Sequence, residues 1–233
     1  MSALKGQRAL VTGAARGIGR ACGDALATLG AEVICVDLTL PKPISGPCFQ
    51  ADVSDATSVK ETFAQVGPLD IVVNAAGILI EEPTLDMGVD GFDKQIAVNL
   101  RGSFLIAQAA LNNMAPHGQG RVILVASELA HLGRARFAGY CASKAGVIGL
   151  TRALAREFAP NILVNAVAPG PTDTPMLSAE NMSPETLDLE ADNPMGRIGQ
   201  PSEIAAAVAF LAGPGATFMT GQTICPSGGA VML

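Results

Sequence analysis

The feature that most constrains the fold is a rhythm of short apolar runs separated by longer amphipathic stretches. Strand-like runs occupy residues 9–12, 32–36, 71–74, 121–126 and 162–167. The connections between them are long enough for helices, so the rhythm indicates repeated βαβ units. Because the runs are too continuously apolar for strands with one wet face, we predict an α/β fold with a doubly wound parallel sheet flanked by helices on both faces.

The composition supports a single core. The chain has 233 residues, of which 49% are apolar and only 4% aromatic, so the core would consist mainly of Ala, Val, Leu and Ile. No linker or repeat interrupts it, and we expect one domain over residues 1–233. No apolar run approaches the roughly 18 residues that a membrane span needs.

Charge and cysteine usage exclude several classes of protein. The formal net charge of −6 argues against nucleic-acid or anionic-membrane partners, because phosphate contacts need clustered Lys and Arg. Five scattered cysteines lack the spacing of metal ligands, which predicts reduced thiols, no metal site and a cytoplasmic location.

A glycine-rich turn follows the first strand. Residues 12–19 read TGAARGIG and lead into a helical pattern, where backbone N–H groups could approach a pyrophosphate. Asp37 ends the second strand and could accept hydrogen bonds from ribose hydroxyls while repelling a 2′-phosphate. The sequence therefore favours NAD over NADP, although Arg16 could instead pair with a 2′-phosphate.

The only tyrosine, Tyr140, lies four residues before Lys144 at the start of a helical pattern, so the two side chains would share a helix face. A free phenol has a pKa of about 10. A nearby ammonium group would lower this pKa by roughly two or three units, enough for proton exchange near neutral pH. An isolated pair of this kind could equally be a packing tyrosine beside a solvated lysine.

Two further polar residues fit the same site. Ser127 follows a strand at its carboxyl end, where open α/β sheets place their ligands, and its hydroxyl could hold a substrate oxygen. Asn99 carries an amide that could fix a water or a backbone group near Lys144. Each residue taken alone could be a cap or turn residue.

Taken together, TGAARGIG (12–19), NAAG (74–77), Asn99, Ser127, YCASK (140–144) and PG (169–170) resemble the short-chain dehydrogenase/reductase family in order and spacing over nearly the whole chain. The resemblance implies a seven-stranded Rossmann-type sheet with cofactor and substrate sites in one domain. It also implies a homotetramer, or a dimer.

Residue roles follow from the resemblance by position. The catalytic set would be Asn99, Ser127, Tyr140 and Lys144, with Ser127 orienting the substrate oxygen, Tyr140 passing its proton and Asn99 holding a water near the lysine. The cofactor would contact Gly13, Arg16, Gly17, Ile18, Gly19, Asp37, Asp52, Val53, Asn74, Gly77, Tyr140, Lys144, Pro169, Gly170, Thr172 and Thr174. Asp52 and Val53 could instead form a strand end and helix cap.

Two positions depart from the family pattern, Thr172 in place of a common aliphatic residue and Ser227 in place of a frequent aspartate. The segment 170–196 is rich in proline and acidic residues and is either a substrate lid or a solvated loop. Glu128, Arg134 and Arg136, with Ser127, are the candidate substrate contacts.

These features predict an NAD-dependent oxidoreductase that transfers a hydride between nicotinamide and a carbonyl or secondary alcohol, with a small sugar, polyol or cyclic alcohol as substrate. One alternative is an NADPH-dependent reductase of a 3-oxoacyl thioester carried by an acyl carrier protein. Another is a sensor that binds NAD without turnover.

Overall fold

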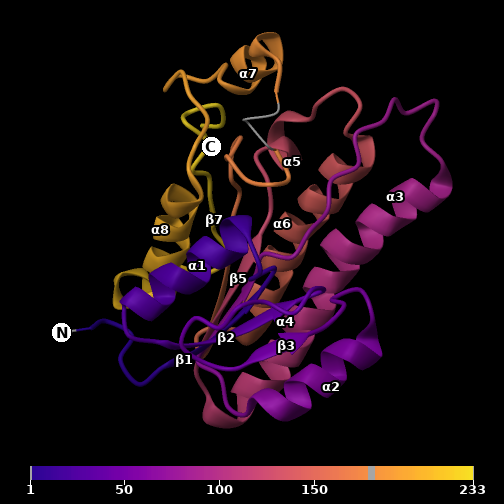
Figure 1. Ribbon diagram of the computed structural model, residues 1–233. Helices are drawn as coiled ribbons and strands as arrows, with labels where there is room; N and C mark the ends of the chain where they lie inside the picture. Colours follow the sequence, from indigo (N-terminus) through magenta and orange to yellow (C-terminus); the bar gives the residue numbers. More distant parts are fainter. Residues whose placement is uncertain (1, 178–181, 233) are drawn as a thin grey trace.

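The computed structural model describes residues 2–177 and 182–232 and contains a seven-stranded, entirely parallel sheet between two layers of helices (Figure 1). The strand order is β3-β2-β1-β4-β5-β6-β7, which confirms the predicted doubly wound sheet. The order reverses between β1 and β4, the kind of switch point at which such sheets bind ligands. The strands are β1 (Arg8–Thr12), β2 (Glu32–Asp37), β3 (Cys48–Gln50), β4 (Ile71–Asn74), β5 (Gly120–Val125), β6 (Ile162–Val167) and β7 (Thr223–Ile224).

The five strands predicted from the apolar runs all form, with boundaries within one residue of the prediction. The runs did not reveal β3 and β7, which have three and two residues and are too short to show a pattern. They are instead defined by pairing, Cys35 with Cys48 and Val167 with Ile224. Short edge strands of this kind depend on their neighbour rather than on their own sequence.

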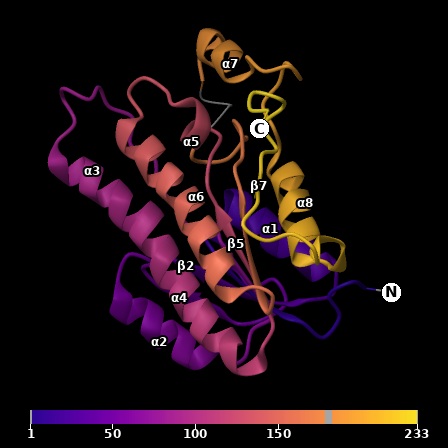
Figure 2. The same ribbon diagram turned by 180° about the vertical axis from the view of Figure 1, so that it is seen from behind.

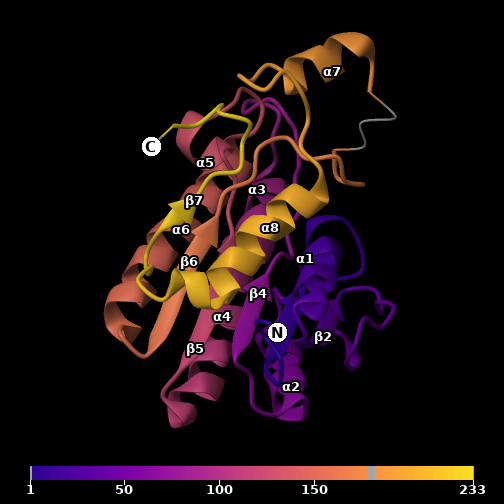
Figure 3. The ribbon, with the colours of Figure 1, turned by 90° about the vertical axis from the view of Figure 1, so that its left-hand side faces the viewer.

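Helices cover the two faces unequally. On one face, α1 (Gly17–Thr28) packs against α8 (Pro201–Ala212), as Figure 3 shows. The opposite face carries α2 (Ala56–Val66), α4 (Gly102–Met114) and α6 (Ala138–Phe158), seen in front in Figure 2. No helix in the described ranges is both long and apolar enough to cross a bilayer.

Short elements complete the described chain. They are α3 (Val89–Gln95), the π-helical turn η1 (Ile96–Arg101), the 3-10 turns η2 (Ala115–His117) and η4 (Pro214–Ala216), α5 (Leu129–Leu132) and α7 (Pro184–Glu190). The last of these, α7, lies beyond the carboxyl ends of the strands, at the top of Figure 1. Residues 178–181 of the predicted lid are outside the described residues.

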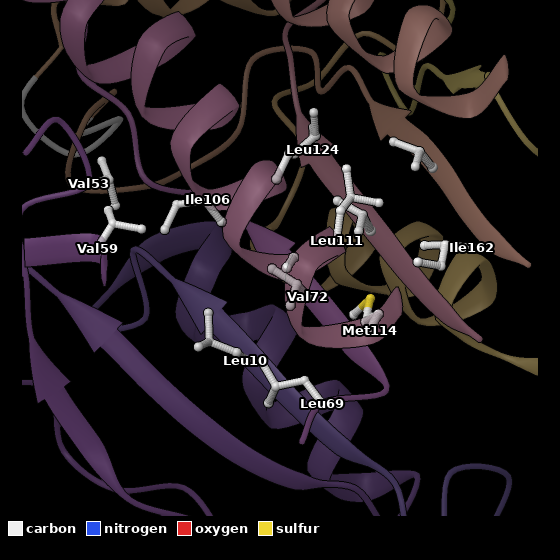
Figure 4. Packing of buried hydrophobic residues seen from close by; sticks show 14 of the residues in the cluster. Leu10, Val53, Val59, Leu69, Val72, Ile106, Leu111, Met114, Leu124 and Ile162 are labelled. Carbon is white, nitrogen blue, oxygen red and sulfur yellow. The ribbon is translucent and has the colours of Figure 1, made fainter. Parts of the chain in front are cut away.

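Alternate residues of each strand point to opposite faces, which builds two apolar cores. Leu10 and Val72 pack on the α2/α4/α6 side, whereas Val11 and Val73 pack on the α1/α8 side. Figure 4 shows Leu10 and Val72 near Leu111 of α4. Burying one such side chain contributes about 1.5–3 kcal/mol, so these cores hold the strand ends in fixed positions.

Candidate active site

The glycine turn at the end of β1 needs its glycines for two different reasons. Gly13 has φ +67°, and a Cβ there would lie 2.9 Å from the backbone of Ala75. A Cβ on Gly19 would lie 2.1 Å from the carbonyl oxygen of Gly13. Absent side chains therefore allow α1 to start directly against the strand and the loop after β4 to approach the turn.

The amino end of α1 is suited to bind an anion. Its N-cap residue, Arg16, is exposed and makes no side-chain capping bond, so the first N–H groups of a 12-residue helix have no capping side chain. Asp37, at the end of β2, accepts a hydrogen bond from Ala15 N at 2.9 Å. The predicted ribose acceptor is thus tied to the turn expected to hold the pyrophosphate.

A buried chain of polar side chains joins this turn to the helical layer. Thr12 Oγ1 donates to Asn74 Oδ1 at 2.5 Å and accepts from Ala76 N at 3.2 Å. Asn74 Nδ2 donates to Ser103 Oγ at 2.9 Å, and Ser103 Oγ donates to the carbonyl of Asn99 at 2.6 Å. Because each buried group is paired, the chain fixes the loop after β4 relative to the helix that carries Asn99.

Asn99 lies in the π-helical turn between α3 and α4 and is fully buried. Its side-chain amide accepts a hydrogen bond from Ile78 N and donates one to Ile78 O, both at 2.9 Å. It also donates a hydrogen bond to Ser143 Oγ at 3.0 Å. Its side chain therefore holds a backbone group, as one predicted option had it. A Cβ on Gly77 would come within 3.2 Å of Asn99 Oδ1 and 3.3 Å of Lys144 Nζ, so the glycine opens this corner.

Tyr140 and Lys144 both lie in α6, which forms where the sequence pattern predicted a helix. Lys144 is 4% exposed, and its Nζ donates to the carbonyl of Val125 at 2.8 Å and lies 5.7 Å from the centre of the Tyr140 ring. Ser143 Oγ donates to the Tyr140 carbonyl at 2.8 Å. The end of β5 and the start of α6 therefore hold the lysine beside the phenol ring.

The predicted lowering of the tyrosine pKa is wrong for this structure. Burial raises the pKa of Tyr140 to about 12, and the hydrogen bond with Ser127 only partly opposes this. Burial also lowers the pKa of Lys144 to about 8. Loss of hydration disfavours both charged forms, and spacing along a helix cannot reveal that loss.

Ser127 lies two residues beyond β5 and is 7% exposed. Its Oγ accepts from Leu129 N at 3.2 Å. The hydroxyl borders a cavity of about 460 Å³ at the carboxyl ends of the strands. Besides Ser127, this cavity is lined by Ile18, Ala75, Gly77, Glu81, Glu128, Arg134, Tyr140, Lys144, Pro169, Gly170, Thr172, Thr174, Met176, Leu177, Met182, Thr186, Leu189 and Glu190, among others.

Of the three charged residues predicted to contact the substrate, the structure places Glu128 and Arg134 at the cavity and Arg136 away from it. Arg134 lines the cavity and forms a 2.7 Å ion pair with Glu190, the last residue of α7. Arg136 does not line the cavity; its Nε donates at 2.7 Å to Glu81, with both side chains about half exposed. Glu128 is 5% exposed, and burial, reinforced by Glu190, raises its pKa to about 7.

The remaining cofactor candidates fall into two groups. Asp52 accepts from both N and Oγ of Ser54, and Val53 is buried in the core, which fits the alternative of a strand end before a helix. Thr172 and Thr174 line the cavity, and Thr172 Oγ1 donates to Gly170 O at 2.8 Å. The Thr172 hydroxyl is therefore satisfied locally at a position where the family often has an aliphatic residue.

Sequence reasoning missed the partners that position these groups. Ser103 and Ser143 support Asn99, and Glu190 pairs with Arg134 across 56 positions. The motif YCASK contains Ser143, but its spacing alone did not distinguish a supporting role.

Comparisons with known proteins find relatives over nearly the whole chain. A family model described as enoyl-(acyl carrier protein) reductase matches residues 13–231. The 3-oxoacyl-[acyl-carrier-protein] reductase FabG of Vibrio cholerae is 40% identical over 99% of both chains. The human (3R)-3-hydroxyacyl-CoA dehydrogenase is 38% identical, covering 98% of this chain and 97% of its own.

A solved structure shares the fold. The aldohexose dehydrogenase of Thermoplasma acidophilum has a TM-score of 0.90 and 30% identity, covering 100% of this chain and 98% of its own. These relatives are oxidoreductases that act on alcohol or carbonyl groups, which argues against a sensor without turnover. The chain belongs to the short-chain dehydrogenase/reductase family of oxidoreductases.

Proposed function

We propose that this protein transfers a hydride between NAD(H) and a carbonyl or secondary alcohol, with Tyr140 as the proton-transfer residue. The observation that carries the proposal is that Ser127, Tyr140 and Lys144 line one cavity with Ile18 of the glycine turn. A nucleotide site and a proton-transfer site thus share one edge of the sheet.

The residues present fit a nicotinamide dinucleotide. The glycine turn and the uncapped amino end of α1 would hold the pyrophosphate, and Asp37 the adenosine ribose. Lys144 and the open corner at Gly77 would hold the nicotinamide ribose. When bound, the nicotinamide supplies or accepts the hydride.

The chain's own residues manage the proton. A pKa of about 12 keeps the Tyr140 phenol protonated near neutral pH, which suits donation to a carbonyl oxygen during reduction. For alcohol oxidation the same phenol must lose its proton, which the charged form of Lys144, 5.7 Å from the ring centre, would favour against the opposing effect of burial. Ser127 orients the substrate oxygen by a hydrogen bond.

For the substrate, we propose a small neutral or hydroxylated alcohol or ketone. The resemblance to a solved aldohexose dehydrogenase supports this class. The second candidate is reduction of a 3-oxoacyl thioester with NADPH, which the similarity to the FabG reductase favours. The exposed guanidinium of Arg16 at the glycine turn would serve a 2′-phosphate in that case.

The test pairs NADH and NADPH binding titrations of wild type and Asp37→Ala, followed by turnover of alcohols, ketones and an acetoacetyl thioester. We expect NADH preference that is lost in Asp37→Ala, and a roughly 10²- to 10⁴-fold loss of kcat in Tyr140→Phe with cofactor affinity retained. A higher catalytic efficiency with NADPH, or with the thioester over all free substrates, would support the second candidate.

We also propose that the protein is a cytoplasmic homotetramer or dimer. Phe92 of α3 and Phe104 of α4 are partly exposed apolar side chains on neighbouring parts of the helical layer, as expected for helices that pack against another subunit. Light scattering coupled to size-exclusion chromatography measures the mass, and a monomer would contradict this proposal.

A further inference from the structure

We propose that Glu128 is a specificity-determining residue, whose carboxylate accepts a hydrogen bond from a second hydroxyl of the substrate, one or two carbons from the reacting carbon. The inference rests on the proposed function, because it concerns the same cavity. It names the substrate class more closely: a vicinal or near-vicinal diol, or the corresponding hydroxyketone.

The carboxylate of Glu128 contains an unsatisfied hydrogen-bond acceptor. Glu128 Oε2 is completely buried and has no hydrogen-bond partner among the described residues. Buried carboxylates are normally paired, because an unpartnered one loses its hydration without compensation. Glu128 lines the cavity, so a ligand there can donate a hydrogen bond to its carboxylate. The pKa of about 7 is consistent with a carboxyl group that lacks such a donor.

The backbone of Glu128 is fixed, and its carboxyl group lies against the loop after β6. Its Oε2 would lie 3.0 Å from a Cβ on Gly170, so the group sits directly above that glycine. Glu128 N donates to Pro169 O at 3.0 Å. Arg134 forms its ion pair with Glu190, at 2.7 Å, and acts on the Glu128 carboxylate through its charge. A fixed acceptor discriminates between substrates better than a mobile one, because it loses less entropy on binding.

Glu128 lies close to the residues that handle the reacting oxygen. Glu128 directly follows Ser127, and consecutive Cα atoms are about 3.8 Å apart. Both residues line the same cavity, Ser127 is hydrogen-bonded to Tyr140, and the charge of Glu128 acts on Tyr140 as well. A substrate whose reacting oxygen is held by Ser127 therefore places a neighbouring hydroxyl within reach of Glu128.

The charge of the cavity points the same way. Its described lining includes the three carboxylates of Glu81, Glu128 and Glu190 but only two cations, Arg134 and Lys144. Arg134 pairs with Glu190, and Glu81 pairs with Arg136, so the charged lining residues outside these ion pairs are Glu128 and Lys144. Because no described lining residue offers an unpaired guanidinium, the cavity suits a neutral, hydroxylated molecule better than a phosphate-bearing carrier.

The experiment measures kcat/KM with NAD⁺ at pH 8.5 for 1,2-cyclohexanediol and cyclohexanol, which differ by one hydroxyl. The proteins are wild type, Glu128→Leu, Glu128→Gln and the control Glu61→Gln, a substitution at an exposed site on α2. Circular dichroism verifies folding. Glutamine keeps an acceptor oxygen, whereas leucine removes it at similar size.

We expect wild type and Glu61→Gln to prefer the diol at least about tenfold, the range of a hydrogen bond to a charged group. Glu128→Leu should lose this preference, because its kcat/KM should fall by a larger factor for the diol than for cyclohexanol, and Glu128→Gln should keep part of the preference. An equal loss for both substrates in Glu128→Leu, or an unchanged preference, would overturn the inference.

The same data separate this inference from the proposed function. Turnover of cyclohexanol by wild type without diol preference overturns the role of Glu128 and leaves the proposed function standing. Wild type that turns over acetoacetyl thioester but neither alcohol overturns the proposed substrate class and the inference with it.

Discussion

Replacing Glu128 with glutamine should stabilise the protein at alkaline pH and not at acid pH. The folded protein raises the pKa of this carboxyl group from 4.5 to about 7, first by burial and then by Glu190, with Arg134 acting in the opposite sense. Tyr140 and Cys225 also lie close enough to feel its charge. The ionised form is therefore less favourable in the folded than in the unfolded chain.

The sign and size follow from proton linkage. Below pH 4.5 the Glu128 carboxyl group is protonated in both the folded and the unfolded chain, so it does not destabilise the fold. Between pH 4.5 and 7 the carboxyl group stays protonated only in the folded chain, so the free energy of unfolding falls as pH rises. Above pH 7 the full penalty applies. At about 1.4 kcal/mol per pKa unit, it amounts to about 3 kcal/mol at pH 8 and less than about 1 kcal/mol at pH 5.

Urea unfolding of wild type and Glu128→Gln at pH 5 and pH 8 measures this penalty. The quantity to compare is the change in mutant effect between the two pH values, because any packing cost of the amide is the same at both. Glu61→Gln, at an exposed site, should change stability by less than about 0.5 kcal/mol at either pH. A mutant effect that does not differ between pH 5 and pH 8 would refute the reasoning.

Three further substitutions test other parts of the site. Gly19→Ala places a Cβ 2.1 Å from a carbonyl oxygen, and should lower the free energy of unfolding by about 1–3 kcal/mol and weaken cofactor binding in a titration. Asn74→Ala removes two buried hydrogen bonds and should lower the free energy of unfolding, measured by thermal denaturation, by about 2–3 kcal/mol. The kcat should also fall, because Asn74 supports Asn99 through Ser103. Arg134→Met leaves Glu190 buried without its cation, so amide hydrogen exchange in α7 should accelerate while exchange in the sheet stays slow. Unchanged exchange in α7 would show that the ion pair does not stabilise this helix.

Much of the architecture was predictable because it depends on local pattern. The continuous apolar runs predicted five parallel strands, and the four-residue spacing of Tyr140 and Lys144 correctly placed both on one helix. The edge strands β3 and β7 were not visible in the runs, because pairing rather than composition makes them strands.

The pKa values and ion pairs of the site were harder to predict from the sequence. The sequence suggested that Lys144 would lower the pKa of Tyr140, but that depends on how much water reaches both groups, and burial dominates. The pairing of Arg134 with Glu190 joins segments with no common motif. Such contacts arise from tertiary packing, which spacing along the chain does not reveal.

The π-helical turn at Ile96–Arg101 limits which changes in chain length the protein can accept. It joins α3 to a helix whose apolar side, including Ile106 and Met114, is locked in the core. Each residue of a helix turns the chain by about 100°. Deleting one residue from this turn would rotate either Asn99 away from Ile78 or the apolar side of α4 out of the core. We therefore expect exposed positions around the turn to accept new side chains, while a single-residue deletion within it destroys activity or folding.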